Sequence, residues 1–161
     1  MTTEDLALAR SLRDRIEIER LVFLYGRALD GREEGDENLF DACMLEDVEV
    51  EYPFGTWKGV AEHKRIHRAT IRVLFTMTQH VISNPLIEIR GDTASAQYYV
   101  HAAHGIATEG GQKIVYGGAV YTHDLVRTDA GWRIRRHHCR PTWIDDEGGL
   151  LAACQAAFDA S

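Results

Sequence analysis

The sequence predicts an α+β fold in which N-terminal helices pack against a cone-shaped, curved antiparallel or mixed sheet that encloses a pocket. Two observations in the pattern predict this class. Apolar side chains recur mostly at helical spacing in the first 75 residues and at alternate positions from about 80 to 140. A third observation is size, because 161 residues with 45% hydrophobic and 27% charged side chains are typical of one globular unit. We therefore expect a single domain over residues 1–161.

Helices are expected in three places before the sheet. The first spans about residues 5–29, where apolar side chains recur at three- and four-residue steps. Asp30-Gly31 is its stop signal, because glycine can adopt the left-handed conformation past a last turn. A second, short helix follows with Asp36 as its N-cap. A third is expected over about residues 60–75.

Strands are expected where the apolar period changes to two. Val48, Val50 and Tyr52 alternate with acidic residues, and Pro53 ends that strand. The further strands are predicted at about 55–59 (a turn or very short strand), 80–89 with a kink at Pro85, 94–108, 114–127 and 132–140. Short glycine-containing turns separate the last four, so we expect an antiparallel meander. Residues 150–158 are rich in alanine and weakly helical.

Charge and composition exclude several classes of partner. Eighteen basic residues against 25 acidic ones give a formal net charge of −7, which argues against nucleic acid or an anionic membrane as the main partner. No apolar run approaches the ~20 residues of a spanning helix, and the N-terminus lacks a signal pattern. We therefore expect a cytoplasmic protein. The three cysteines show no zinc-ligand spacing and are expected to be reduced thiols.

Alternation along the strands places two histidines on one buried face. Even positions of the strand 94–108 are the apolar ones, so His104 is expected inside and His101 outside. In the preceding strand His80 and Asn84 share the face of Ile82, which we take as the inner one. Burying two imidazoles is costly without partners. They are therefore either hydrogen-bonded core residues or a functional pair.

Asp30 makes the functional interpretation stronger. It ends the first helix, where an ionised carboxylate faces the negative end of the helix dipole. It is either a solvated turn residue or a group that orients a histidine and stabilises its charged form. Tyr25 lies roughly 140° away around an ideal helix, so both reach one cavity only if Asp30 leaves helical geometry. Tyr52 is a third polar side chain that we expect in the same space.

Several segments together resemble a known family. They are Tyr25…Ala28-Leu29-Asp30, Tyr52, Thr78-Gln79-His80-Val81-Ile82-Ser83-Asn84, Gly91-Asp92-Thr93-Ala94, His104, Tyr121 and Asp129-Ala130-Gly131-Trp132-Arg133-Ile134. In this order they resemble the SnoaL-like branch of the nuclear transport factor 2-like superfamily, which includes scytalone dehydratase, bile acid dehydratase, hexachlorocyclohexane dehydrochlorinase and polyketide cyclases. The resemblance covers about residues 10–145, the expected core, and leaves 146–161 as a C-terminal tail.

The resemblance implies roles for five residues. Asp30 and His80 match the family's catalytic dyad, and His104 matches a second histidine of scytalone dehydratase. Tyr25 and Tyr52 match catalytic tyrosines of the two dehydratases. The implied protein is a cofactor-free lyase, foremost a dehydratase, that acts on a small hydroxylated, apolar ring or polyketide-like compound without a metal. An isomerase or cyclase, and a non-catalytic ligand-binding or association domain, remain alternatives. A homo-oligomer is also implied, with a trimer favoured over a dimer.

This chain also departs from the family's pattern. Leu29 stands where scytalone dehydratase has a tyrosine, and Tyr121 falls near the position of an asparagine. The substrate of that enzyme therefore cannot be transferred to this chain.

Further residues are expected to contact substrate or to lie elsewhere. The expected substrate contacts are Asn84, Tyr121, Trp57, Phe54 and His138, with His138 at the pocket mouth because it shares the parity of Trp132 and Ile134. By the same parity Cys139 faces away. His63 and His67 have a spacing that can bind a metal, but no third ligand is evident and their face is expected to be solvated. No metal site is therefore predicted.

Overall fold

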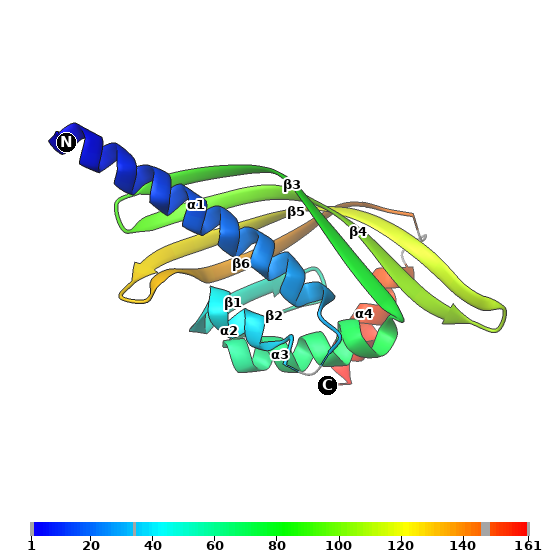
Figure 1. The fold of residues 1–161 in the computed structure, drawn as a ribbon. Coiled ribbons are helices and arrows are strands. Elements are labelled where there is room, and N and C mark those ends of the chain that lie inside the picture. Colours follow the sequence, from blue (N-terminus) through cyan, green and yellow to red (C-terminus); the bar gives the residue numbers. More distant parts are fainter. Residues whose placement is uncertain (1, 34, 146–148, 161) are drawn as a thin grey trace.

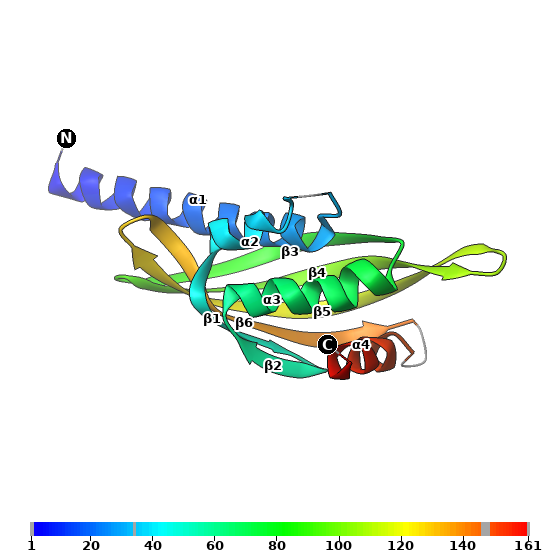
Figure 2. The same cartoon turned by 90° about the horizontal axis from the view of Figure 1, so that it is seen from below.

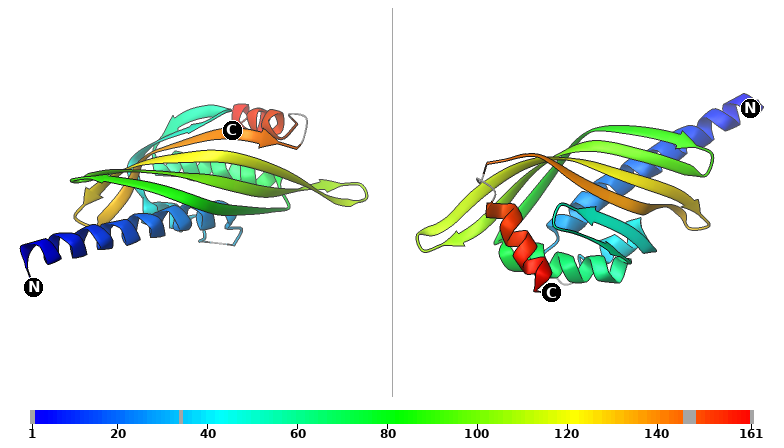
Figure 3. Two further views of the ribbon diagram at one scale, coloured as in Figure 1. Left: turned by 90° about the horizontal axis from the view of Figure 1, so that it is seen from above. Right: turned by 180° about the vertical axis from the view of Figure 1, so that it is seen from behind.

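A six-stranded mixed sheet forms the body of the protein, and its helices lie on one side of it (Figures 1 and 3). The computed structural model describes residues 2–33, 35–145 and 149–160. In chain order the elements are α1 (Thr3–Asp30), α2 (Asn38–Cys43), β1 (Met44–Tyr52), β2 (Gly55–Lys58), α3 (Val60–His67), the π-helical segment η1 (Arg68–Arg72), β3 (Met77–Arg90), β4 (Thr93–Thr108), β5 (Gly111–Thr128), β6 (Gly131–Ile144) and α4 (Gly149–Asp159). The predicted α+β class is confirmed.

The strands are arranged in the order β2-β1-β6-β5-β4-β3. Strands β3 to β6 form the expected antiparallel meander, and β1 joins it by parallel pairing with β6. The long strands twist and curve over α3 and α4 (Figures 1 and 2). The sheet therefore has a concave face that the helices cover and an opposite face without helices (Figure 3).

Helix α1 packs against the sheet through a stripe at helical spacing. Ile18, Val22, Tyr25 and Leu29 recur three and four residues apart and are buried. The first turns of α1 extend beyond the sheet, and Leu8 and other apolar side chains there are exposed (Figure 1). Only the second half of α1 is thus part of the core, and Asp30 comes at its inner end.

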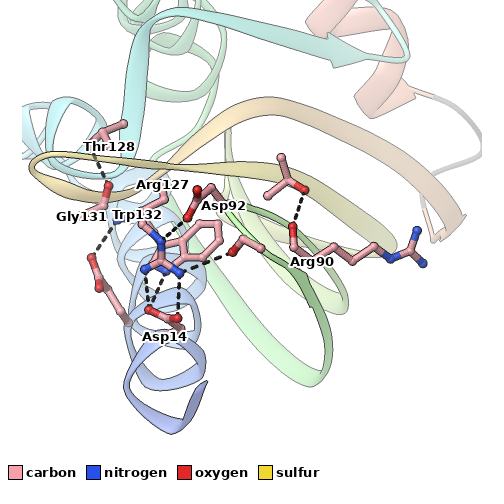
Figure 4. A network of polar contacts seen from close by, with 10 residues as sticks. Asp14, Arg90, Asp92, Arg127, Thr128, Gly131 and Trp132 are labelled. Atoms are coloured by element: carbon pink, nitrogen blue, oxygen red, sulfur yellow. Dashed lines mark hydrogen bonds and ion pairs between the residues drawn. The ribbon is translucent and has the colours of Figure 1, made fainter. Parts of the chain in front are cut away.

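A partly buried ion-pair network fixes α1 to the β5–β6 turn (Figure 4). Arg127 donates to both oxygens of Asp14 at 2.6 and 2.7 Å and to Asp92 at 2.8 Å. Its guanidinium also lies 4.4 Å from the ring centroid of Trp132, whose Nε1–H donates to Asp14. The Arg127 hydrogen bonds are the main reason that the pKa of Asp14 falls to about 2.

Two of the register shifts in the sheet change the side on which predicted site residues face. In β3 the register shifts between Ser83 and Leu86, and Asn84 has a φ of 54°. Asn84 is consequently exposed, and the expectation that it shares the inner face of His80 is wrong. The kink predicted at Pro85 coincides with this shift. A bulge adds one residue to a strand and so reverses the alternation beyond it.

The second bulge lies in β6. Ile134 pairs with Leu125 and Arg136 pairs with Asp124, so Arg135 is the extra residue. Beyond it His137 and Cys139 are buried, and His138 is half-exposed. The parity argument that placed His138 inside and Cys139 outside is therefore wrong.

The helix ends also differ from expectation. Gly31 has a φ of −63°, so it does not adopt the left-handed conformation, and Asp30 remains within α1. Asp36 does not cap α2; its carboxylate accepts the Glu33 backbone N–H instead. The third predicted helix becomes π-helical after His67. Within residues 2–33, 35–145 and 149–160, no helix is long and apolar enough to cross a membrane.

Candidate active site

Asp30 and His80 form a close pair between the end of α1 and the start of β3. The His80 backbone N–H donates to Asp30 Oδ2 at 2.9 Å, and His80 Nδ1 lies 2.6 Å from Oδ1. A carboxylate accepts only, so Nδ1 carries the proton and Nε2 keeps its lone pair. The His80 side chain is 4% exposed, and that of Asp30 is 24% exposed. The pair therefore presents a histidine whose tautomer and orientation are fixed.

His80 opens onto a cavity of about 90 Å³ on the concave face. Its walls come from the sheet, η1 and α4, and most of them are apolar. They include Leu29, Tyr52, Ile71, Phe75, Val100, Ala102, His104, Gly117, Ala119, Tyr121, Cys139, Pro141, Ile144, Leu150, Leu151 and Cys154. No aspartate, glutamate, lysine or arginine of the described residues lines it. The cavity thus combines a polar dyad with apolar walls, the usual composition of a small-molecule site.

His104 lies across from His80, as the alternation predicts. The register pairs His104 with Thr78, and the two imidazole centroids are 5.6 Å apart with their planes at 90°. Burial lowers the pKa of His104 to about 4, and the nearby His80 lowers it further. Its Nδ1 has no hydrogen-bond partner within the described parts of the chain. At neutral pH His104 is therefore an uncharged imidazole with an unused nitrogen beside the cavity.

Tyr25 and Tyr52 meet through their hydroxyl groups, which are 2.9 Å apart. Tyr52 and Tyr121 line the cavity, whereas Tyr25 lies behind them in the core. Burial raises the pKa of all three phenols, so they stay protonated at neutral pH. The structure brings Tyr52 into contact with the cavity and connects Tyr25 to it only through Tyr52.

Helix α4 forms part of the cavity wall. Leu150, Leu151 and Cys154 line the space, and α4 lies beside η1 and the end of β6 (Figures 2 and 3). The weakly helical tail predicted from the sequence is thus a helix that helps to separate the dyad from solvent.

The other expected substrate contacts are distributed differently. Trp57 and Phe54 stack on Tyr52, at centroid distances of 5.5 and 5.3 Å, and support the cavity wall from behind. Asn84 and His138 lie on the outside of the sheet, because the bulges in β3 and β6 reverse the alternation of side chains at or before these residues. Tyr121 lines the cavity, as expected.

A buried cluster of imidazoles behind the tyrosines is missed by sequence reasoning. Tyr98 Oη lies 3.1 Å from His123 Nε2, which is 3.0 Å from His137 Nδ1. His63 and His67, which we expected on a solvated face, are also buried. The parity of His123 with Tyr121 was the one available signal for its burial. Burial lowers the pKa of His63 and His123 to about 3 and that of His67 to about 4.

Within the described ranges, no group of three or more histidine, cysteine, aspartate or glutamate side chains could hold a metal ion. Acid–base chemistry by the dyad needs none.

Comparisons with known proteins place this geometry in context. The chain matches the family described as "SnoaL-like domain" over residues 10–138. An uncharacterized protein of Mycobacterium tuberculosis H37Rv is 31% identical over 126 residues, which are 76% of this chain and 82% of that protein.

Solved structures share the fold. An NTF2-like protein with a cystatin-like fold from Novosphingobium aromaticivorans matches with a TM-score of 0.71 and 26% identity, covering 95% of this chain and 96% of that one. Hexachlorocyclohexane dehydrochlorinase LinA-type3 from Novosphingobium barchaimii matches with a TM-score of 0.74 and 20% identity, covering 83% of this chain and 90% of the other.

Proposed function

This chain belongs to the SnoaL-like domain family, and from that premise we propose that it is a cofactor-free lyase, foremost a dehydratase. The observation that supports this most directly is the Asp30–His80 pair, which is fixed by two hydrogen bonds and opens onto an apolar cavity. A structural relative bears the name of a dehydrochlorinase, an enzyme of elimination chemistry. The proposed substrate is a small, uncharged, hydroxylated ring compound.

In the proposed reaction, His80 Nε2 removes a proton from a carbon next to an activating group. The C–H electron pair becomes the new double bond, and the neighbouring C–O bond breaks. Asp30 stabilises the imidazolium that forms, because its carboxylate stays hydrogen-bonded to Nδ1–H. Tyr52 donates a proton to the departing hydroxide, which leaves as water, and His80 returns its proton to restore that donor, while the unprotonated Nδ1 of His104 accepts a hydrogen bond from the substrate. General acid–base catalysis of this kind contributes ~10²–10⁴-fold.

The walls of the cavity support the choice of substrate. An anionic substrate would need a cationic or strongly donating partner, and no charged side chain of the described residues reaches the cavity. Aliphatic and aromatic walls favour an uncharged ring, and the tyrosine hydroxyl groups provide donors for one or two polar substituents.

Asp30→Asn tests the proposal. Hydroxylated ring compounds are first screened for thermal stabilisation of the wild-type protein, and ligands are then assayed by mass spectrometry for loss of water. The neutral amide of this variant cannot stabilise the imidazolium, so turnover is expected to fall ~10²–10⁴-fold while ligand affinity changes little.

The control is His101→Asn, because His101 lies on the outer face of the same sheet. It should leave turnover unchanged. Unchanged turnover of the true substrate by Asp30→Asn would contradict the proposal, and a product of unchanged mass would point to the isomerase or cyclase alternative.

A further inference from the structure

The backbone carbonyl of Leu29 has an unusual position at the end of α1. The last carbonyls of a helix have no partner within the helix and must find one elsewhere. The Leu29 oxygen is 3.0 Å from His67 Nε2 and 3.5 Å from Thr78 Oγ1, and all three residues are buried. Side chains from α3 and β3 therefore cap α1 at the residue before Asp30.

The protonation of His67 follows from this contact. A carbonyl oxygen only accepts, so Nε2 of His67 carries the proton and Nδ1 does not. His67 Nδ1 has no hydrogen-bond partner within the described residues. The Leu29 carbonyl is thus the one hydrogen-bond acceptor that the described part of the chain gives to this ring, and the ring of Phe40 packs against it edge-on. The contact with α1 therefore accounts for a polar side chain at this buried position.

The capped carbonyl belongs to the peptide group that leads into Asp30. Because a peptide group is planar, fixing the Leu29 oxygen fixes the orientation of the Asp30 amide and limits the directions its side chain can take. The Asp30 carboxylate must reach two donors of His80 at 2.6 and 2.9 Å at the same time. Such bidentate contacts tolerate little rotation.

We propose that His67 is a positioning residue for the Asp30–His80 pair. It holds the end of α1 so that the carboxylate meets both His80 donors, and it does not itself contact substrate. Thr78, two residues before His80 on β3, supports the same carbonyl from the other side. The backbone becomes π-helical directly after His67, and Thr70 Oγ1 donates to the Ile66 carbonyl in this segment. Such segments are frequent at functional sites.

The first test does not depend on knowing the substrate. In protein labelled with ¹⁵N-histidine, NMR reports the chemical shift of the His80 Nδ1–H proton and the rate at which this proton exchanges with water. His67→Phe keeps a ring of similar shape without a donor. We expect it to move the His80 Nδ1–H resonance upfield and to speed its exchange with water, since the accepting carboxylate is less well placed. His67→Gln offers an amide donor to the same carbonyl and is expected to restore both.

His63→Phe is the matched control. His63 lies one turn earlier on α3 and is equally buried, but its Nδ1 accepts the Trp57 indole N–H and its ring stacks on Tyr25, so it does not hydrogen-bond to the carbonyl at the end of α1. It should leave the His80 signal as in the wild type. Thr78→Val is a nearly isosteric second variant that removes the other donor, and it should move the His80 Nδ1–H resonance in the same direction by a smaller amount. Thr78→Val therefore tests the capping of the Leu29 carbonyl even if His67→Phe does not fold.

The inference is overturned if His67→Phe leaves the His80 Nδ1–H resonance and its exchange rate unchanged, or if His63→Phe alters them as strongly. It is also overturned if Thr78→Val has no effect or if His67→Gln fails to restore the wild-type values. The kinetic arm rests on the proposed function. With a substrate in hand, His67→Phe should lower kcat ~10–100-fold with little change in KM. If Asp30→Asn leaves turnover intact while the NMR results hold, the proposed function fails and the positioning role stands.

Discussion

At the scale of single residues, Tyr52 is the side chain that joins the cavity to the core behind it. Its hydroxyl accepts or donates a hydrogen bond with Tyr25, its ring stacks on Trp57, and it lines the cavity. Tyr25 has the same functional group but reaches the cavity only through Tyr52. The two phenols are therefore not equivalent, although the family resemblance assigns both to catalysis.

Tyr52→Phe should reduce turnover more than Tyr25→Phe does. Removing a donor that stabilises developing charge in an active site costs about 10²–10³-fold in kcat. Loss of the Tyr25 hydroxyl removes only the partner of that donor, so a smaller decrease is expected. Steady-state kinetics of both variants checks the order, and equal effects, or a larger one for Tyr25→Phe, would contradict the assignment.

The inner position of His104 could be predicted from a local rule, whereas the pairing of Asp30 with His80, which lie 50 positions apart in the chain, was implied by the family resemblance. Strand alternation placed His104 inside, and His80 was assigned to the same face by its neighbour Ile82. The position of Asp30 at a helix end suggested a partner for it. His67 could not be predicted as a cap of α1, because that contact joins residues 38 positions apart in the chain and depends on how α3 packs.

At the scale of secondary-structure elements, the Asp14–Arg127 ion pair fixes α1 to the sheet end far from the cavity (Figure 4). Arg127→Met should destabilise the fold by about 3 kcal/mol, because it leaves the Asp14 carboxylate buried without its partner. Urea unfolding measures the change. Arg90→Met nearby removes an exposed pair with Glu88 and should change stability by less than about 0.5 kcal/mol. Equal changes in the free energy of unfolding for the two variants would show that the Asp14–Arg127 network contributes no more to stability than an exposed ion pair.

Element boundaries were largely predictable, whereas bulges were not. The helical and alternating patterns gave α1 and the four long strands to within a few residues. The extra residue at Arg135 leaves no mark in the composition of β6, so parity counted from Trp132 assigned His138 to the wrong face. Asn84-Pro85 at least contains a residue that disrupts pairing, and a kink there could be expected.

At the scale of the whole molecule, buried and uncharged histidines determine how the stability of the fold changes in acid. Burial lowers the pKa of His63 and His123 to about 3 and that of His67 and His104 to about 4, whereas an unfolded histidine titrates near 6.5. Below pH 6.5 the unfolded chain therefore binds more protons than the folded one, and stability falls as the pH falls towards 4.

We expect each of these histidines to cost about 2 kcal/mol of stability at pH 5 relative to pH 7. Because a domain has only about 5–15 kcal/mol in total, acid unfolding should begin near pH 5, above the range in which carboxylates such as Asp14 are protonated. Urea titrations from pH 8 to pH 4.5 measure the slope. A free energy of unfolding that stays constant between pH 7 and pH 5 would contradict the expectation.

The face of the sheet opposite the helices is the predicted surface of self-association. Val81, Leu86, Tyr99, Tyr116 and Trp143 are exposed there, and His101 lies against Tyr116 and Trp143. We propose that this face is buried in a homo-oligomer, with a trimer favoured over a dimer. Light scattering after size-exclusion chromatography should give a multiple of 18.2 kDa, and Tyr99→Glu should shift it towards the monomer. A monomeric wild-type protein would contradict the proposal.

The unpaired Arg135 in β6 also determines which changes of chain length this strand can survive. Removing that one residue would make Ile134 and Arg136 consecutive, as their partners Leu125 and Asp124 already are, so His137 and Cys139 would still face inward. Replacing Arg135 would also leave the pairing intact, because its side chain is exposed. Natural variants of this protein should therefore tolerate either a substitution or a deletion at this position, whereas loss of a paired residue such as His137 would turn His138 inward.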